Sequence, residues 1–264
     1  MNRTGIVIAF AVAVSVGLVF AIRPDFDIWL AGLFFDPITK RFILQNWILQ
    51  LRDGSLYLVT LFALAPVAAM LLKLLCPTRR LPVPGRAVVF LLASLALAPG
   101  IMVNVILKEH WGRSRPIDIP QFAGTERFVA WWDPRGICPK NCSYVSGDVS
   151  GSFWMLAPAA LTPPTWRPLA YAAAVAFGGF VGLLRMAMGA HFFTDVVFSG
   201  VFTFLMVWLV HGLVYRWPAT RLSDDAIERA IARPGLHLRK IGAAIAAPLC
   251  TLFRGSKPRQ GPTD

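Results

Sequence analysis

The chain has 264 residues, of which 56% are hydrophobic and only 15% are charged, and its mean hydropathy is +0.59. This composition excludes an ordinary soluble domain and indicates a polytopic membrane protein. The net charge is +12, but most basic residues lie in short segments beside apolar stretches. That arrangement favours a topology signal and contact with anionic lipids over nucleic-acid binding.

Five stretches are long and apolar enough to cross a bilayer, at about residues 5–22, 55–76, 87–107, 168–188 and 195–215. A shorter stretch, 150–163, follows a Ser/Gly-rich segment and is expected to complete the set. We therefore expect an all-α domain over residues 1–215, built as a bundle of six transmembrane helices. The first stretch is interpreted as an uncleaved anchor, because no small-x-small cleavage site clearly follows it.

Residues 23–53 separate the first two apolar stretches and mix Trp, Phe and Leu with polar side chains. This mixture is typical of helices that lie in the membrane interface. The sequence therefore predicts interfacial helices in the first outer loop.

The distribution of basic residues predicts the orientation of the bundle. If both termini are cytoplasmic, 15 of the 26 Lys and Arg residues fall on the inner side, as the positive-inside rule requires. The segments 108–150 and 185–195 then face the periplasm from the inner membrane. Residues 216–264 form a basic cytoplasmic tail, expected to be amphipathic in part and disordered at its end.

Two of the four cysteines, Cys138 and Cys142, lie in the long outer loop. In an oxidising periplasm this pair could form a small disulfide-closed ring. Unpaired thiols are the alternative. A metal site is the least favoured reading, because no second ligand pair of suitable spacing is nearby.

Two polar clusters stand at the predicted outer ends of apolar stretches. Lys108 and Arg115 are seven residues apart, so on a helix both point to one side, and Pro116 ends that helix. Ser146 and Gly147 open the next apolar stretch, where free backbone N–H groups can bind an anion. The neighbouring His110 and Arg113 have no informative spacing and are interpreted as ordinary boundary residues.

A third cluster contains Arg185, His191 and Asp195. His191 and Asp195 are four residues apart, which suits an imidazole oriented by a carboxylate. Any one of these side chains alone could be a boundary cation or a helix cap, but three such clusters on one face are hard to explain as topology. They suit phosphoryl transfer with His191 as nucleophile. No dense set of carboxylates suggests magnesium, so no metal or other cofactor is expected.

The combination Lys-x6-Arg-Pro at 108–116, Ser-Gly at 146–147 and Arg-x5-His-x3-Asp at 185–195 resembles the three-part signature of the type 2 phosphatidic acid phosphatase family. That family includes membrane lipid phosphatases and soluble vanadium haloperoxidases. The resemblance implies that the nucleophile is His191, that its partner is Asp195, and that the phosphate is bound by Lys108, Arg115, Ser146, Gly147 and Arg185.

Two positions depart from the family pattern. Asp148 stands where the family has a histidine that protonates the leaving oxygen, and Leu184 stands where it has a serine. Asp148 could act as the general acid if its surroundings favoured the protonated form. Alternatively, it could only orient other groups.

The expected function is removal of a phosphate from a lipid phosphate or lipid pyrophosphate on the periplasmic side, through a phosphohistidine. Lipid A, phosphatidylglycerol phosphate, phosphatidate and polyprenyl diphosphate are all candidate substrates. A lipid-to-lipid phosphotransferase on the same pocket is one alternative. A lipid-binding or transport protein that has lost turnover is another, and Asp148 is its best support. We expect no nucleic-acid partner and no obligate protein partner.

Overall fold

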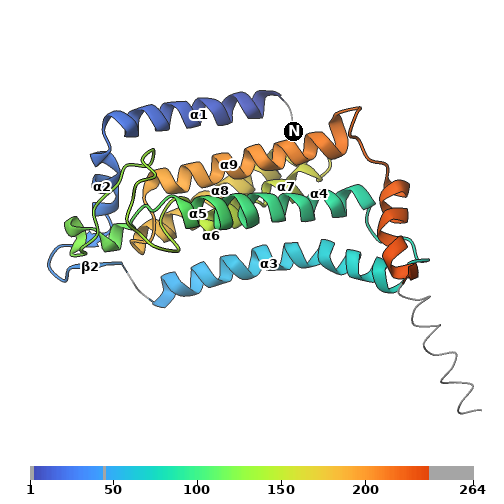
Figure 1. Cartoon of the computed structure of the whole chain (residues 1–264), viewed down its shortest axis with the longest axis horizontal. Helices are drawn as coiled ribbons and strands as arrows, with labels where there is room; N and C mark the ends of the chain where they lie inside the picture. The colour runs from blue at the N-terminus through green and yellow to red at the C-terminus, as the bar shows by residue number, and fades with distance from the viewer. Residues whose placement is uncertain (1–2, 44–45, 238–264) are drawn as a thin grey trace, which may run out of the picture.

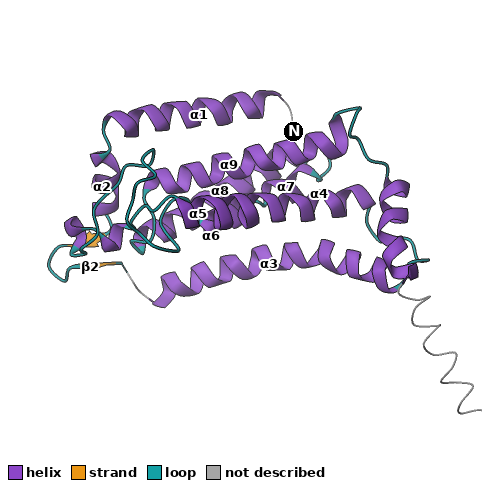
Figure 2. Cartoon of the chain, in the orientation of Figure 1, coloured by secondary structure: helices purple, strands orange, loops and turns teal. Residues whose placement is uncertain are grey.

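The computed structural model describes residues 3–43 and 46–237, and this part of the chain is predominantly helical (Figures 1 and 2). It contains five helices that are long and apolar enough to cross a membrane, in agreement with the five long stretches read from the sequence. These are α1 (Arg3–Ile22), α3 (Asn46–Leu75), the continuous run of α4 (Gly85–Leu95), η1 (Ala96–Leu107) and α5 (Lys108–His110), then α8 (Arg167–Ala187), and finally α9 (Phe193–His211) with its extension η4 (Gly212–Arg216).

The sixth expected span, 150–163, is not one long helix. Its residues fall in α6 (Gly147–Phe153), in α7 (Leu156–Ala160) and in the turn that follows. Most side chains of α6 and α7 are buried, and the two short helices pack against α8, α9 and α4. Because surrounding helices cover them, they need neither the length nor the continuous apolar face of a lipid-exposed span.

The first outer segment also differs from the expectation of interfacial helices alone. It contains α2 (Asp25–Gly32) and a small antiparallel hairpin of β1 (Phe35–Asp36) and β2 (Arg41–Phe42). Residues 46–53, expected to form part of a second interfacial helix, are instead the first turns of α3. A cluster of buried apolar side chains joins this segment to the loop after α5 and to the start of α9, and it contains Ala31, Phe42, Ile119, Phe122 and Phe192. Residues 23–43 are therefore part of the scaffold around the end of the bundle that carries the three polar clusters. The loop after α5 includes two short 3-10 turns, η2 (Pro116–Asp118) and η3 (Pro120–Phe122).

Helix α9 is central, and it contacts α1, α4, α6 and α8. Glycines allow the close approach of α8 to its neighbours. A Cβ atom at Gly178 would lie 2.7 Å from the Phe153 ring, and one at Gly182 would lie 2.3 Å from Val196. Gly178 and Gly182 therefore serve helix packing.

At the opposite end of the bundle, a helix over residues 224–237 docks onto α3 and α4. Lys73 and Glu228 form an ion pair at 2.8 Å, and Arg86 and Asp224 form another at 2.9 Å. Ile227 is buried in this contact. The remainder of the tail, including the end expected to be disordered, lies outside the described residues.

Candidate active site

His191 lies on a tight turn between α8 and α9. Gly189 follows the end of α8 with φ = +66°, and the N–H of Ala190 donates to the carbonyl of Arg185 at 3.0 Å. A left-handed residue just after a helix is a common way to end it, and glycine adopts that conformation at no steric cost. A Cβ atom at Gly189 would also lie 2.4 Å from the ring of Phe42. The turn leaves the His191 side chain only 1% exposed.

The hydrogen bonding of His191 defines its tautomer. Its Nδ1 atom is 2.8 Å from the backbone carbonyl oxygen of Ser143. Because a carbonyl only accepts, Nδ1 carries the proton and Nε2 keeps its lone pair. Burial holds the pKa of His191 well below its usual value, and the positive charges of Arg185, Arg115 and Lys108 lower it further. The imidazole is therefore neutral at physiological pH, which is the form a nucleophile requires.

The three cations that act on His191 come from separate elements. Lys108 begins α5, Arg115 precedes η2, and Arg185 lies in the last turn of α8. Arg115 donates to the carbonyl of Asn141 at 2.8 Å. Arg185 is 9% exposed, and within the described part of the chain its hydrogen bonds reach only the sulfur of Met188, at 3.9 Å. Most of its donors therefore remain available for an anion.

Ser146 and Gly147 lie at the start of α6. Ser146 is the N-cap residue, and its Oγ accepts from the N–H of Val149 at 3.5 Å. A Cβ atom at Gly147 would lie 2.4 Å from Oδ1 of Asn104, so a larger residue there would displace the Asn104 side chain. The π-helical stretch η1 runs directly into Lys108, and π-type segments are often found at functional sites. A direct contact of Ser146 and Gly147 with phosphate stays a prediction.

The structure changes the expected role of Asp195. Its Oδ2 atom is 3.9 Å from Nδ1 of His191, too far for a hydrogen bond, because the Ser143 carbonyl takes that place. Asp195 instead accepts hydrogen bonds from the Ser143 hydroxyl and, at 2.8 Å, from the N–H of Phe192. Asp195 therefore contacts Ser143, whose carbonyl accepts the hydrogen bond from His191, and Phe192, which follows His191 in the chain.

Arg113 is not the ordinary boundary residue that the sequence suggested. It is fully buried, and its guanidinium forms ion pairs with Asp195 and, at 2.8 Å, with Asp27 of α2. Its Cζ atom lies 4.4 Å from the centroid of the Phe192 ring. Asp27 also accepts from the N–H of Thr194 at 3.1 Å. The sequence signal for this network was the pair of acidic residues, Asp25 and Asp27, in the otherwise aromatic and apolar stretch at 25–35. By contrast, His110 is exposed, as an ordinary boundary residue would be.

Asp148 also has partners that the sequence did not indicate. Its Oδ2 atom is 3.0 Å from Nη2 of Arg52 on α3 and 3.4 Å from Nε of Arg185. Arg52 was missed because it lies 96 positions from Asp148 along the chain, and no local pattern connects them.

Of the alternatives for the outer cysteines, the structure has the disulfide between Cys138 and Cys142, whose Cα atoms are 5.8 Å apart. The N–H of Cys138 donates to the carbonyl of Gly112 at 3.0 Å, and that of Cys142 donates to the carbonyl of Lys108 at 3.2 Å. The small ring is therefore attached to the backbone of the Lys108 cluster.

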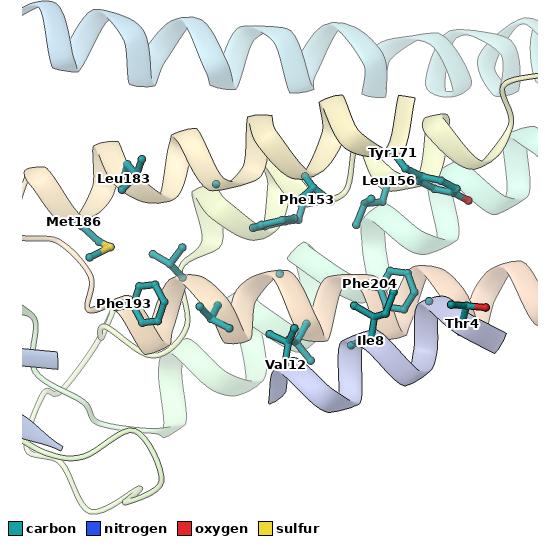
Figure 3. Close-up of a pocket in the computed structure, with 18 residues that line it drawn as sticks. Thr4, Ile8, Val12, Phe153, Leu156, Tyr171, Leu183, Met186, Phe193 and Phe204 are labelled. Carbon is teal, nitrogen blue, oxygen red and sulfur yellow. The ribbon is translucent and has the colours of Figure 1, made fainter. Parts of the chain in front are cut away.

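A large apolar groove lies away from these residues. It has a volume of about 750 Å³ and runs along α1, α8 and α9, from Met186 and Phe193 at one end to Thr4 and Tyr171 at the other (Figure 3). None of the residues implied to bind phosphate lines it. Its walls come from the candidate membrane spans α1, α8 and α9, and from Phe153 of α6 and Leu156 of α7.

Comparison with known proteins agrees with the geometry of the site. Residues 87–219 match the PAP2 superfamily, a range that includes all three clusters. A lipid A 4'-phosphatase of Francisella tularensis subsp. novicida is 34% identical over 219 residues, which are 82% of this chain and 98% of that protein. The chain belongs to the PAP2 superfamily. It is a membrane phosphatase, a hydrolase of phosphate monoesters.

Two further relatives of this PAP2 phosphatase match a shorter region. The lipid A 4'-phosphatase of Rhizobium leguminosarum is 37% identical over 106 residues, covering 40% of this chain and 46% of the relative. That of Rhizobium etli is 36% identical over 105 residues, covering 40% and 41%. No solved structure matches the chain.

Proposed function

We propose that this PAP2 phosphatase removes a phosphate group, held as a monoester, from lipid A at the periplasmic face of the inner membrane. The reaction passes through a phosphohistidine on His191. The observation that carries the proposal is the buried, neutral imidazole, whose Nδ1 donates to the Ser143 carbonyl while three cations lie near the ring. Lipid A is favoured over the other candidate lipids because all three relatives are named lipid A 4'-phosphatases.

The proposed reaction has two steps. Nε2 of His191 attacks phosphorus as the bond between phosphorus and the sugar oxygen breaks, and the departing sugar oxygen takes a proton from water to become a hydroxyl. Lys108, Arg115 and Arg185 stabilise the charge on the nonbridging oxygens. Water then hydrolyses the phosphohistidine and releases inorganic phosphate.

Asp195 supports this reaction indirectly. Its hydrogen bonds to the Ser143 hydroxyl and the Phe192 N–H fix the two backbone segments between which the imidazole lies. The Ser143 carbonyl then keeps the proton on Nδ1, so that Nε2 faces the phosphate.

The proposed orientation has both termini in the cytoplasm. Its support is the excess of basic residues on the side of the termini, together with the position of the signature clusters at the other end of the bundle. The outer leaflet of the inner membrane would then present the lipid phosphate to the site.

Phosphate release by the purified protein tests the proposal, with lipid A, phosphatidylglycerol phosphate, phosphatidate and polyprenyl diphosphate compared in the same detergent. Release from lipid A that is abolished in His191→Ala is expected. Hydrolysis of another lipid with lipid A untouched would overturn the proposed substrate. Transfer of labelled phosphate to a second lipid would indicate a phosphotransferase.

A further inference from the structure

Asp148 lies between two arginines from different helices. Its Oδ2 atom accepts a hydrogen bond from Nε of Arg52 at 3.1 Å, forms an ion pair with Nη2 of Arg52 at 3.0 Å, and is 3.4 Å from Nε of Arg185. The side chains of Arg52, Asp148 and Arg185 are 30%, 21% and 10% exposed. Arg52 approaches from α3, whereas Asp148 and Arg185 belong to α6 and α8. The carboxylate thus connects a cation of the phosphate site to a cation at its edge.

A carboxylate at this position creates an electrostatic conflict. It repels a phosphate dianion and competes with that phosphate for Arg185. The hydrogen bond and ion pair from Arg52 offset this effect, because they hold the carboxylate and neutralise its charge. Arg52 also pairs with Asp53 at 2.9 Å, but Asp53 is 53% exposed and well hydrated.

We propose that Arg52 is a positioning residue of the phosphate site: it holds the Asp148 carboxylate, so that Arg185 is oriented by Asp148 yet released to the substrate phosphate. This inference rests on the proposed function, since it assumes that Arg185 binds phosphate. It assigns Asp148 to positioning, and not to protonation of the leaving oxygen.

Two other roles for these residues lead to different outcomes. If Asp148 were the general acid, its replacement by asparagine would abolish turnover and change the pH profile, whatever residue stands at position 52. If Arg52 itself contacted the substrate, its loss would weaken binding equally with or without the Asp148 charge. Positioning through Asp148 predicts instead that Asp148→Asn restores the phosphate binding that is lost in Arg52→Gln.

The test is a double-mutant cycle on the full chain with Arg52→Gln, Asp148→Asn and the pair together. Inorganic phosphate is the probe, as a competitive inhibitor of hydrolysis and as a directly titrated ligand. We expect Arg52→Gln to weaken phosphate binding by roughly tenfold or more, because an uncompensated carboxylate then holds Arg185. Adding Asp148→Asn should restore most of that affinity. Arg52→Lys, which keeps the charge but not the guanidinium Nε–H donor, should lie between wild type and Arg52→Gln.

Matched controls separate positioning from folding. Arg23→Gln breaks an exposed ion pair with Asp25 in the first outer segment, and Asp53→Asn removes the other partner of Arg52. Both should leave phosphate binding unchanged. Thermal unfolding of every variant shows whether it is folded at the assay temperature.

The outcomes distinguish this inference from the proposed function. Additive losses in the cycle, or an inactive Asp148→Asn protein, would overturn the positioning role of Arg52 even if wild type hydrolyses lipid A. Direct titration that shows compensation, in a protein that releases no phosphate from any lipid, would support the role of Arg52 and overturn the proposed function.

Discussion

Replacement of Arg113 by methionine should strongly destabilise the protein, because Arg113 links two buried carboxylates. Its guanidinium also donates to the carbonyl of Val129 at 2.9 Å and to Thr194 at 2.8 Å. Hydrogen bonds to charged groups contribute about 1.5–3 kcal/mol each, so the two carboxylate contacts total about 3–6 kcal/mol. Breaking a buried ion pair costs about 3–5 kcal/mol. We therefore expect Arg113→Met to lower the free energy of unfolding by about 4 kcal/mol.

Reversible unfolding in mixed micelles, followed by tryptophan fluorescence, measures this change. Arg135→Met is the control, since the Arg135 side chain is 80% exposed in its pair with Asp133, and no measurable change is expected. Asp27→Asn added to Arg113→Met removes one of the two uncompensated charges and should recover part of the stability. A stability of Arg113→Met within about 1 kcal/mol of wild type, the range of surface ion pairs, would refute the reasoning.

Three further predictions follow from the site. Because the pKa of His191 is lowered, its neutral form persists as the pH falls through about 6.5, so the acidic limb of kcat/KM should lie well below that value; a limb at or above 6.5 would contradict this. Gly189→Ala should destabilise the protein and reduce activity severely, because φ is positive at this position and the new Cβ atom would clash with the Phe42 ring. Gly179→Ala is the control, since it has open space around its Cβ position, and it should change neither stability nor activity in unfolding and activity assays. Replacement of both Cys138 and Cys142 by serine should weaken inhibition by inorganic phosphate several-fold, because the ring is hydrogen-bonded to the backbone of Lys108; an unchanged inhibition constant would show that the ring does not support the site.

Sequence patterns predicted much of the fold and part of the candidate site, because these features depend on residues that are close together in the chain. Apolar stretches about 20 residues long reveal spans, and the spacing of Arg185 and His191 identifies one end of the site. The Lys108 and Arg185 clusters are brought together around His191, since both stand at span ends on the same side of the bundle. The short sixth span was misread because α6 and α7 are covered by neighbouring helices, and hydropathy alone does not reveal which side chains protein surrounds.

Other contacts could not be predicted from local patterns. The acceptor for His191 is a backbone carbonyl, that of Ser143, and a carbonyl has no signature in the sequence. Arg52 comes from α3 and Asp27 from α2, and both reach the site only through the fold. Arg113 resembles a boundary cation until its burial is known. Long-range packing, and not motif spacing, determines these partners.

Formation of a phosphohistidine is the most direct test of the central claim. The purified protein is mixed with lipid A labelled in its phosphate, quenched with alkali within the first turnover and digested for peptide mapping. We predict an alkali-stable, acid-labile label on the peptide that contains His191, and its absence in His191→Ala. Label on another residue, or full turnover by His191→Ala, would contradict the account.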